Sequence, residues 1–342
     1  MDHLTSDLIN HCENSKTKAV DFLLSKFNHD GTVGPVKEDG FYFYRLPWSL
    51  SIAGETKSAN IVCSWILNNM MTAEGDFDNG FRKVQDAYAY RNATLIYGAH
   101  MLRRYDISHS GMPFLLSLQD PLSGGFANNM NQNGPSDDMD IPYSVGCGLA
   151  CIATGYFDQA RKVFNYLDLI WKQQPNLPSE LYYNFSRKTQ KIIKSSVERD
   201  TFWDVVVSQQ DSYQRWTVGG IAAAFLCRLY LVDREKKYLD LAVKYMNFSM
   251  NSTEAQFKYA SACKSGWGSS LLYLVTGEEI YLDWTKKLAQ WFIEHQLEDG
   301  SWSMNKLGKK EPDSESGKIH LTAEFVVHVD TIISCLSSRL VK

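Results

Sequence analysis

The sequence predicts an all-α fold, an (α/α)6 toroid or barrel of six helical hairpins, with a small hairpin inserted near residues 175–212. Two interleaved repeats lead to this prediction. One marks turns at which amphipathic segments end, and the other marks turns at which apolar segments rich in small residues end. Units that recur along a whole chain indicate a repeat architecture built from one supersecondary element. We therefore expect a single α/α-toroid domain over residues 1–342.

The first repeat is clearest at residues 287–302, which read aromatic, apolar, three residues, Gln, three residues, Gly, one residue and Trp. Residues 114–126 repeat this order with one extra residue before the glycine. Residues 65–77 repeat it with Met70 in the place of the glutamine, and residues 22–33 keep only the frame. Each copy is expected to end one helix and begin a turn.

This pattern resembles the QW repeat of the terpenoid cyclases and protein prenyltransferases, which are α/α toroids. The resemblance implies that each copy ends an outer helix and turns the chain back toward an inner helix. Residues 287–302 fit the family pattern best, although Leu288 stands where that family usually has glycine. The resemblance supports the fold more than it supports any reaction.

The second repeat lies at Gly54, Gly155, Asp233 and Gly277, each of which closes an apolar segment and precedes an amphipathic one. Glycine at the position after a helix can adopt the left-handed backbone that satisfies the last carbonyl groups. A short link of this kind makes the next helix antiparallel to its neighbour.

Together the two repeats predict alternating helices. The outer helices carry charges opposite an apolar stripe and are expected at 16–27, 57–71, 108–119, 157–173, 236–250 and 279–296. The inner helices are apolar on most faces and rich in Gly, Ala, Ser and Cys, and they are expected at 45–53, 86–103, 142–154, 215–232, 259–276 and 322–340.

Residues 175–212 interrupt this rhythm. Alternating aromatic and β-branched residues predict a short hairpin there, and inserted hairpins on a rigid scaffold often act as lids. A hairpin that only packs on the rim is the alternative. Residues 128–142, rich in asparagine and aspartate, are expected at the rim too.

Composition narrows the class of partner. A hydrophobic content of 44% and an aromatic content of 13% suffice for a large core and a lined cavity. A net charge of −4 gives no reason to expect nucleic acid or an anionic membrane as partner. We expect no signal peptide and no membrane span. Seven scattered cysteines indicate a reduced, cytoplasmic protein with buried thiols.

The candidate binding residues stand just before or within the first turns of the inner helices, where the N-terminal helix ends face one mouth of the toroid. Positive helix ends favour an anionic or electron-rich group there. Tyrosine or tryptophan recurs with a charged residue at nearly every such turn. The substrate-binding candidates are Tyr44, Arg45, Trp48, Tyr90, Arg91, Asp138, Tyr213, Arg215, Trp216, Lys264 and Trp267.

Asp140 is the first candidate for a catalytic acid–base group, with Tyr143 nearby in the next helix. Residues 136–140 invite comparison with the acidic motif of class II terpenoid cyclases, although the order of the aspartates is reversed here. A solvated acidic loop or a helix N-cap is the alternative interpretation.

Glu324 and His328 form the second candidate acid–base pair, because residues four apart share a helix face. The alternative is a buried histidine that is hydrogen-bonded within the ring. His320 is the only further residue near enough to complete a metal site, so no metal is expected, and no nucleotide or flavin signature indicates a cofactor.

Three functions fit these features. The leading hypothesis is a cofactor-independent cyclase, isomerase or lyase of small-molecule biosynthesis, which acts by acid–base catalysis on a hydrophobic, terpenoid-like or polyketide-like substrate in an aromatic-lined cavity. The second is a carbohydrate-active (α/α)6 enzyme, either a glycoside hydrolase, an epimerase or a uronate lyase. The third is a noncatalytic scaffold subunit. The oligomeric state stays open.

Overall fold

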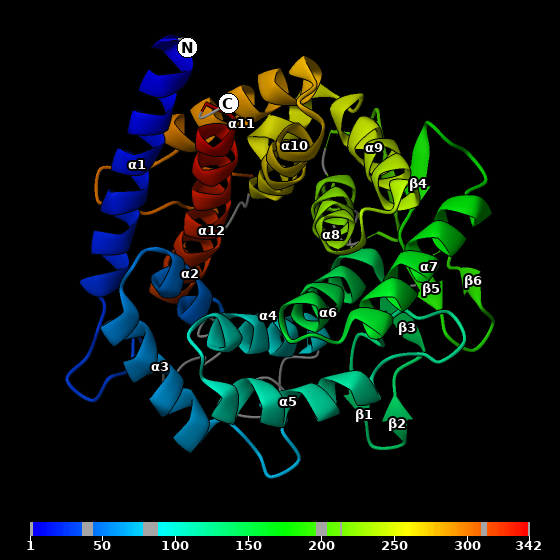
Figure 1. The fold of residues 1–342 in the computed structure, drawn as a ribbon, viewed down its shortest axis with the longest axis horizontal. Helices are drawn as coiled ribbons and strands as arrows, with labels where there is room; N and C mark the ends of the chain where they lie inside the picture. Colours follow the sequence, from blue (N-terminus) through cyan, green and yellow to red (C-terminus); the bar gives the residue numbers. More distant parts are fainter. Residues whose placement is uncertain are drawn as a thin grey trace.

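The structure is a computed structural model that describes residues 3–35, 44–77, 88–195, 204–212, 214–308 and 313–340. Twelve α-helices lie within these ranges, and they alternate between an inner and an outer ring (Figure 1). Each inner helix packs against the next, in the order α2, α4, α6, α8, α10 and α12, and α12 packs against α2 to close the ring. The predicted (α/α)6 toroid is confirmed.

The outer helices match their predicted ranges closely, because their amphipathic pattern is strong. Only the first departs clearly, since it begins at His3 rather than near residue 16. The outer helices are α1 (His3–Leu24), α3 (Thr56–Asn69), α5 (Tyr105–Ser117), α7 (Phe157–Gln173), α9 (Lys236–Met250) and α11 (Glu279–Glu294).

The inner helices are less well bounded by sequence. The last begins at Glu315 instead of 322, and the fifth begins at Cys263 after two short 3-10 turns, η3 (Glu254–Lys258) and η4 (Ala260–Ala262). The inner helices are α2 (Leu46–Ile52), α4 (Tyr88–Met101), α6 (Ile141–Ala153), α8 (Val218–Asp233), α10 (Cys263–Thr276) and α12 (Glu315–Leu340).

Two glutamines of the first repeat join neighbouring outer helices. Gln119 Nε2 donates to the carbonyl oxygen of Gly124, at 3.0 Å, and to that of Gln159 on α7, also at 3.0 Å. Gln296 Nε2 donates in the same way to Gly300 and to Ser15 on α1, both at 2.8 Å. Each glutamine therefore fixes its own turn and the next outer helix together.

The turn glycines also require close backbone approach. Gly300 has φ +85°, and a Cβ atom there would lie 2.2 Å from the carbonyl oxygen of Lys18 on α1. In the second copy of the repeat, the bridge between Met71 and Phe77 places Met71, not Met70, at the position of Gln119. The sequence alignment of this copy was wrong by one residue.

The strands lie on the side of the ring where α7 stands, between the ends of α5 and α9 (Figure 1). Instead of one hairpin, the insertion forms two ladders: β4 pairs with β7, and β5 pairs with both β6 and β3, which precedes α6. The strands are β1 (Met130–Asn131), β2 (Gly134–Pro135), β3 (Asp138–Asp140), β4 (Glu180–Tyr182), β5 (Asn184–Ser186), β6 (Lys191–Ile192) and β7 (Val206–Ser208).

Helix α12 is long and apolar enough to cross a membrane by length and composition, contrary to the sequence-based expectation that no segment would be. In the structure, 78% of its apolar window is buried, because α12 is an inner helix of the ring. All seven cysteines are free and buried, as expected.

A candidate active site at one end of the inner ring

Five sequence-predicted residues from four inner-ring segments meet at one end of the toroid. Arg45 is the N-cap of α2, Tyr90 lies in the first turn of α4, and Lys264 lies in the first turn of α10. Glu324 and His328 come from the middle of α12. We call these five residues the charged cluster.

Glu324 stands at the centre of the charged cluster. Its carboxylate forms ion pairs with the guanidinium of Arg45 and with the ammonium of Lys264. Lys264 Nζ also lies 3.1 Å from His328 Nε2 and 3.4 Å from the hydroxyl of Tyr90. The side chains of Arg45, Lys264 and Glu324 keep 8%, 5% and 12% of their surface exposed, so the cluster is nearly enclosed but not sealed.

Small residues bring Lys264 to this position. A Cβ atom on Gly220 of α8 would lie 2.2 Å from the carbonyl oxygen of Lys264, and one on Gly268 would lie 2.5 Å from that of Gly220. These glycines let α8 and α10 approach closely, so the first turn of α10 enters the ring. On α12, the four-residue spacing places His328 Nε2 3.5 Å from Glu324 Oε1.

The charged cluster has more positive than negative charge. Burial opposes ionisation of Glu324, but Arg45 and Lys264 outweigh it and place the pKa of this carboxyl well below its ordinary value. Burial likewise opposes the charge on Lys264, yet Glu324 raises the pKa of the ammonium above its ordinary value. Two cations therefore surround one carboxylate, and the cluster has a net positive charge.

The two histidines of α12 are neutral. Burial and the nearby Lys264 lower the pKa of His328 to about 3, and burial with Arg45 lowers that of His320 to about 3. An ammonium can only donate a hydrogen bond, so His328 Nε2 is the acceptor and Nδ1 has the proton. Among the described residues, His328 Nδ1 is buried without a hydrogen-bond partner.

Aromatic rings surround the charged cluster. Trp267 lies against His328, with ring centroids 5.0 Å apart, and against Trp48, at 5.9 Å. Tyr44 lies between Tyr90 and His320, at 6.3 and 5.4 Å. The indole Nε1 atom of Trp267 is buried and has no partner within the described part of the chain.

Cys263, Glu324 and His328 have ligand atoms within 4.8 Å of one another, a spacing that could accommodate a metal ion. However, the ammonium of Lys264 already contacts Glu324 and His328. Burial raises the pKa of the Cys263 thiol, which disfavours the thiolate that a metal requires. These three residues therefore fit a metal ion poorly while Lys264 is present.

Asp140 lies apart from the charged cluster, on α6, which is three positions from α12 around the inner ring. It is the N-cap of α6 and accepts a hydrogen bond of 2.7 Å from the backbone N–H of Tyr143. The geometry thus matches the capping alternative. Tyr143 connects the two regions, because its ring lies 6.0 Å from that of Tyr90 and under the guanidinium of Arg215, at 5.3 Å.

The other candidates divide between interior and rim. Arg91 and Trp216 are buried. The backbone N–H of Trp216 donates a hydrogen bond to Ser261 Oγ at 3.2 Å. Asp138 lies on β3 at the rim, where its carbonyl accepts from the N–H of Asn128 at 2.8 Å. Tyr213 lies outside the described residues.

The sequence-based search missed Asn184 and Tyr97. Asn184 is buried on β5, directly opposite Asp140, and Tyr97 of α4 lies 4.3 Å from Trp48 between ring centroids. The alternation of Leu181, Tyr183 and Phe185 was the available signal for Asn184, because it places Asn184 on the opposite strand face.

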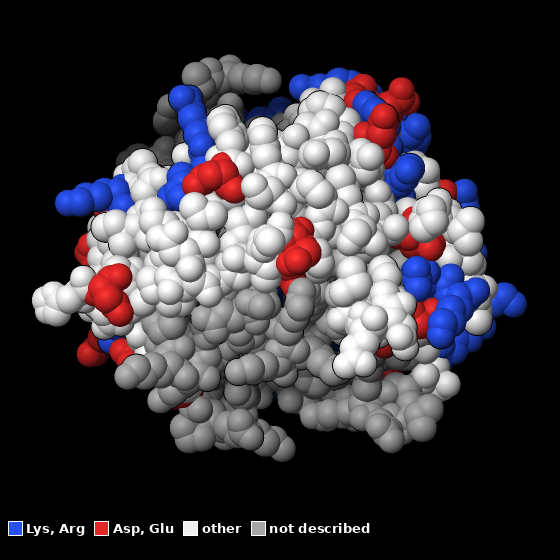
Figure 2. All heavy atoms as spheres, turned by 90° about the horizontal axis from the view of Figure 1, so that it is seen from below, with Lys and Arg blue, Asp and Glu red and all other residues white. Residues whose placement is uncertain are grey.

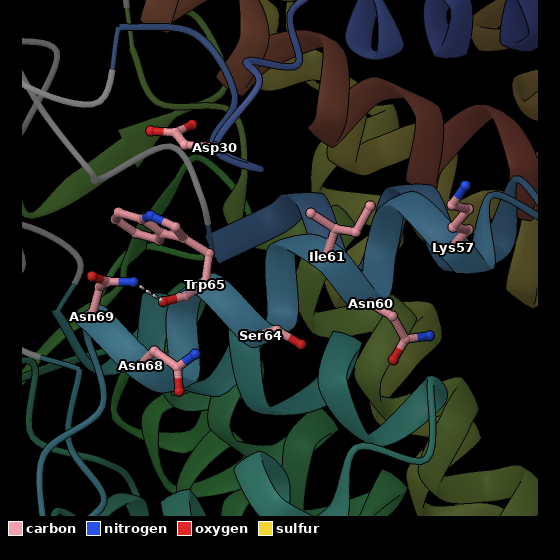
Figure 3. Close-up of a pocket in the computed structure, with 8 residues that line it drawn as sticks. All are labelled: Asp30, Lys57, Asn60, Ile61, Ser64, Trp65, Asn68 and Asn69. Carbon is pink, nitrogen blue, oxygen red and sulfur yellow. Dashed lines mark hydrogen bonds between the residues drawn. The ribbon is translucent and has the colours of Figure 1, made fainter.

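The outer surface of the ring has scattered charged side chains, unlike the enclosed charged cluster. The face in Figure 2 has basic and acidic side chains scattered around wide uncharged areas. A hollow of about 500 Å³ lies on outer helix α3, near Trp65, Asn69 and Asp30 (Figure 3). It is an open groove on the outside of the ring, and we place the candidate active site at the charged cluster instead.

No protein-family model and no curated protein matches the sequence. Solved structures share the fold along almost the whole chain. A D-mannose isomerase has a TM-score of 0.65 at 13% identity and covers 94% of this chain and 97% of its own. The type II terpene cyclase MstE from Scytonema, in complex with geranylgeranyl dihydroxybenzoate, has a TM-score of 0.59 at 13% identity and covers 96% and 99%.

An unsaturated glucuronyl hydrolase specific for heparin is also similar, with a TM-score of 0.63 at 11% identity over 98% of each chain. At these identities the likeness establishes the α/α-toroid fold, as the sequence resemblance implied. Enzymes of this fold include an isomerase, a cyclase and a hydrolase, so the fold alone does not select a reaction.

Proposed function

We propose that this protein is an enzyme that isomerises or epimerises a hydroxylated carbonyl compound of the sugar class, by moving a proton at the carbon next to the carbonyl group. One observation supports this most strongly: a neutral histidine, a protonated lysine and an ionised glutamate touch one another inside the ring. Such a set matches general acid–base catalysis.

The charge of the cluster separates the three sequence-based hypotheses. Glu324 stays ionised, so it does not donate the proton that starts a cyclisation or a glycoside hydrolysis, and Asp140 would have to donate it instead. Arg45 and Lys264 would also repel a developing carbocation, but they would stabilise the oxyanion of an enediolate. A scaffold subunit would gain little stability from such buried charges, because packed apolar side chains often replace a buried ion pair without loss.

In the proposed reaction, the ammonium of Lys264 donates to the carbonyl oxygen of the substrate while His328 Nε2 removes the proton from the adjacent carbon. The product of this step is an enediolate beside a protonated His328. For isomerisation, the imidazolium returns the proton to the former carbonyl carbon, and the hydroxyl proton of the other oxygen moves to the enediolate oxygen through Lys264. For epimerisation, the imidazolium returns the proton to the original carbon on its opposite face. No other reactant is consumed.

The low pKa of His328 is compatible with this role. Burial and Lys264 lower it in the free protein. In the complex, Lys264 turns toward the substrate oxygen and negative charge develops beside it, so protonation of His328 becomes less costly. Arg45 keeps Glu324 ionised, and the carboxylate of Glu324 stabilises the positive charge that develops on the imidazole of His328.

The neighbouring groups favour a polar substrate over the hydrophobic one of the leading sequence-based hypothesis. Buried polar groups in proteins are ordinarily hydrogen-bonded, yet Trp267 Nε1 and His328 Nδ1 lack partners among the described residues. Hydroxyl groups of a sugar would supply them, and the ring of Trp267 offers an apolar face for stacking. The lid role of residues 175–212 is part of this proposal, since β5 joins the insertion to the strand before α6.

The test is proton exchange in D2O. Purified protein is incubated with neutral aldoses and ketoses, including D-mannose, D-glucose and D-fructose. Deuterium at the carbon next to the carbonyl group (carbon 2 of an aldose, carbon 1 of a ketose) is followed by NMR together with product formation. We expect exchange by the wild type and a loss of about 10²–10⁴-fold in His328→Gln and in Lys264→Met. Exchange that survives both substitutions would contradict the proposal.

A control separates chemistry from folding. Ser261→Ala removes a polar atom near the ring mouth but none of the charged cluster, and it should keep most of the exchange activity. Circular dichroism of all variants should show the helical spectrum of the wild type.

A cyclase is the second candidate function, because aromatic rings surround the charged cluster. These rings belong to Tyr44, Trp48, Tyr90 and Trp267. A prenylated aromatic acid is the appropriate probe. Cyclised product formed by the wild type and abolished in Asp140→Asn, with no sugar exchange, would favour this second function.

A further inference from the structure

The three-stranded sheet of β3, β5 and β6 has two unlike faces. Side chains alternate across a strand, and the register pairs Met139 with Phe185 and Phe185 with Ile192, all of them buried. The opposite face is polar. Its residues, which we call the polar sheet face, are Asn128, Asp138, Asp140, Asn184, Ser186 and Lys191.

Asn184 is the anomaly of the polar sheet face. It is 1% exposed, yet neither its Nδ2 nor its Oδ1 atom has a hydrogen-bond partner among the described residues. Asn128 Oδ1 is buried without a partner as well. Ser186, two residues along the same strand, differs because its hydroxyl donates to the carboxylate of Asp137 at 3.0 Å.

A buried amide with no partner is costly, at about 1–3 kcal/mol. Evolution tolerates that cost where a ligand satisfies the group. An amide both donates and accepts, as a hydroxyl group does. An anion could only accept from the Asn184 Nδ2 group, whereas a hydroxyl group can satisfy both atoms of the amide, so the matching chemistry is a neutral polyol.

The polar sheet face is continuous with the charged cluster. Asp140 caps α6, and Tyr143 in its first turn reaches Tyr90, whose hydroxyl contacts Lys264. These contacts link the two regions, and the proposed substrate would direct its far hydroxyl groups from the cluster toward β5.

We infer that Asn184, with Asn128, forms a second subsite that binds neutral hydroxyl groups of the substrate away from the reacting carbon. This inference rests on the proposed function and makes its substrate an uncharged sugar rather than a uronate. It also makes Asn184 a specificity-determining residue and not a catalytic one.

The test is Asn184→Leu, which keeps the approximate volume and removes both polar atoms. We expect the dissociation constant for the aldose that the wild type exchanges fastest, measured by ligand-observed NMR, to rise about tenfold. The KM should rise similarly with kcat nearly unchanged, and the melting temperature should stay level or increase because an unsatisfied group is gone. D-glucuronate should bind the wild type less tightly than D-glucose.

Ser186→Ala is the matched control, because this residue shares the strand and the face but already has a partner. It should lower the melting temperature and leave sugar binding unchanged. If Asn184→Leu lowers the melting temperature without weakening binding, the amide serves internal structure or a trapped water, and the subsite is wrong. In that case exchange abolished by His328→Gln would still support the proposed function.

A wild type that exchanges no neutral sugar would overturn both proposals together. A wild type that exchanges only uronates would leave proton transfer intact and overturn the subsite alone.

Discussion

Glu324 and Asp140 are both buried carboxylates near the mouth of the ring, but they differ in what satisfies them. Asp140 accepts from the backbone N–H of Tyr143 and caps the start of α6. Glu324 sits in the middle of α12 and is satisfied by the side-chain cations of two other helices. A carboxylate bound by side chains can exchange its partners for a ligand, whereas one that caps a helix loses part of the stability of that helix when it does so.

The largest effect should come from Glu324→Gln. Removing the carboxylate leaves Arg45 and Lys264 as uncompensated buried charges, and breaking a buried pair costs about 3–5 kcal/mol. Chemical denaturation of the purified variant should show a loss of that size in the free energy of unfolding. A loss below about 1 kcal/mol would mean that solvent already screens the cluster.

The double variant Glu324→Gln with Lys264→Met is the control for this interpretation. It removes one of the stranded cations, so it should recover part of the lost stability. Additive losses from the two changes would contradict direct pairing.

Acid should destabilise the folded protein through the two buried histidines of α12, His320 and His328. Their pKa of about 3 in the folded protein lies below the unfolded value of about 6.5. The unfolded chain therefore binds more protons in this window, and stability falls as the pH drops from about 6.5 toward 3. Each histidine should contribute up to about 1.4 kcal/mol per pH unit. Denaturation of His328→Gln across this range should show a shallower slope.

The smallest effect belongs to the other carboxylate. Asp140→Ala removes the N-cap of α6 and should cost about 0.5–2 kcal/mol. Asp140→Asn keeps a capping oxygen and should cost less. Under the proposed function, both should retain proton exchange within about tenfold, and thermal denaturation with the D2O assay measures the two effects side by side. Exchange lost in Asp140→Asn at unchanged stability would restore Asp140 as the catalytic acid.

Sequence patterns predicted the outer helices from α3 to α11 within a few residues, as at α7 and α9, because an amphipathic stripe opposes their charges. The start of α1 was placed too late. The start of α12 was also placed late, since residues 315–318 are polar and include Gly317, which disfavours a helix. The bounds of an inner helix are set by packing on several faces, which a periodic pattern reports poorly.

The sequence predicted most residues of the candidate site but not which of them form ion pairs and hydrogen bonds with one another. Arg45, Lys264, Glu324 and His328 were all selected, yet only the closed ring brings Arg45 of α2 to Glu324 of α12. Asp140 was ranked first because acidic segments before a helix look alike whether they cap or catalyse. Asn184 has no charge and lies in a strand, so nothing in its type indicated a binding role.

The position of Glu324 in the last inner helix of the ring has a consequence for how the chain folds during its synthesis. A ribosome releases α2 and α10 before α12, so Arg45 and Lys264 emerge without their counter-charge. Until the last helix docks between α2 and α10, an incomplete ring would have to leave these two cations in water. The carboxylate thus stabilises closure of the ring by α12, because docking of this helix supplies the counter-charge of the two cations.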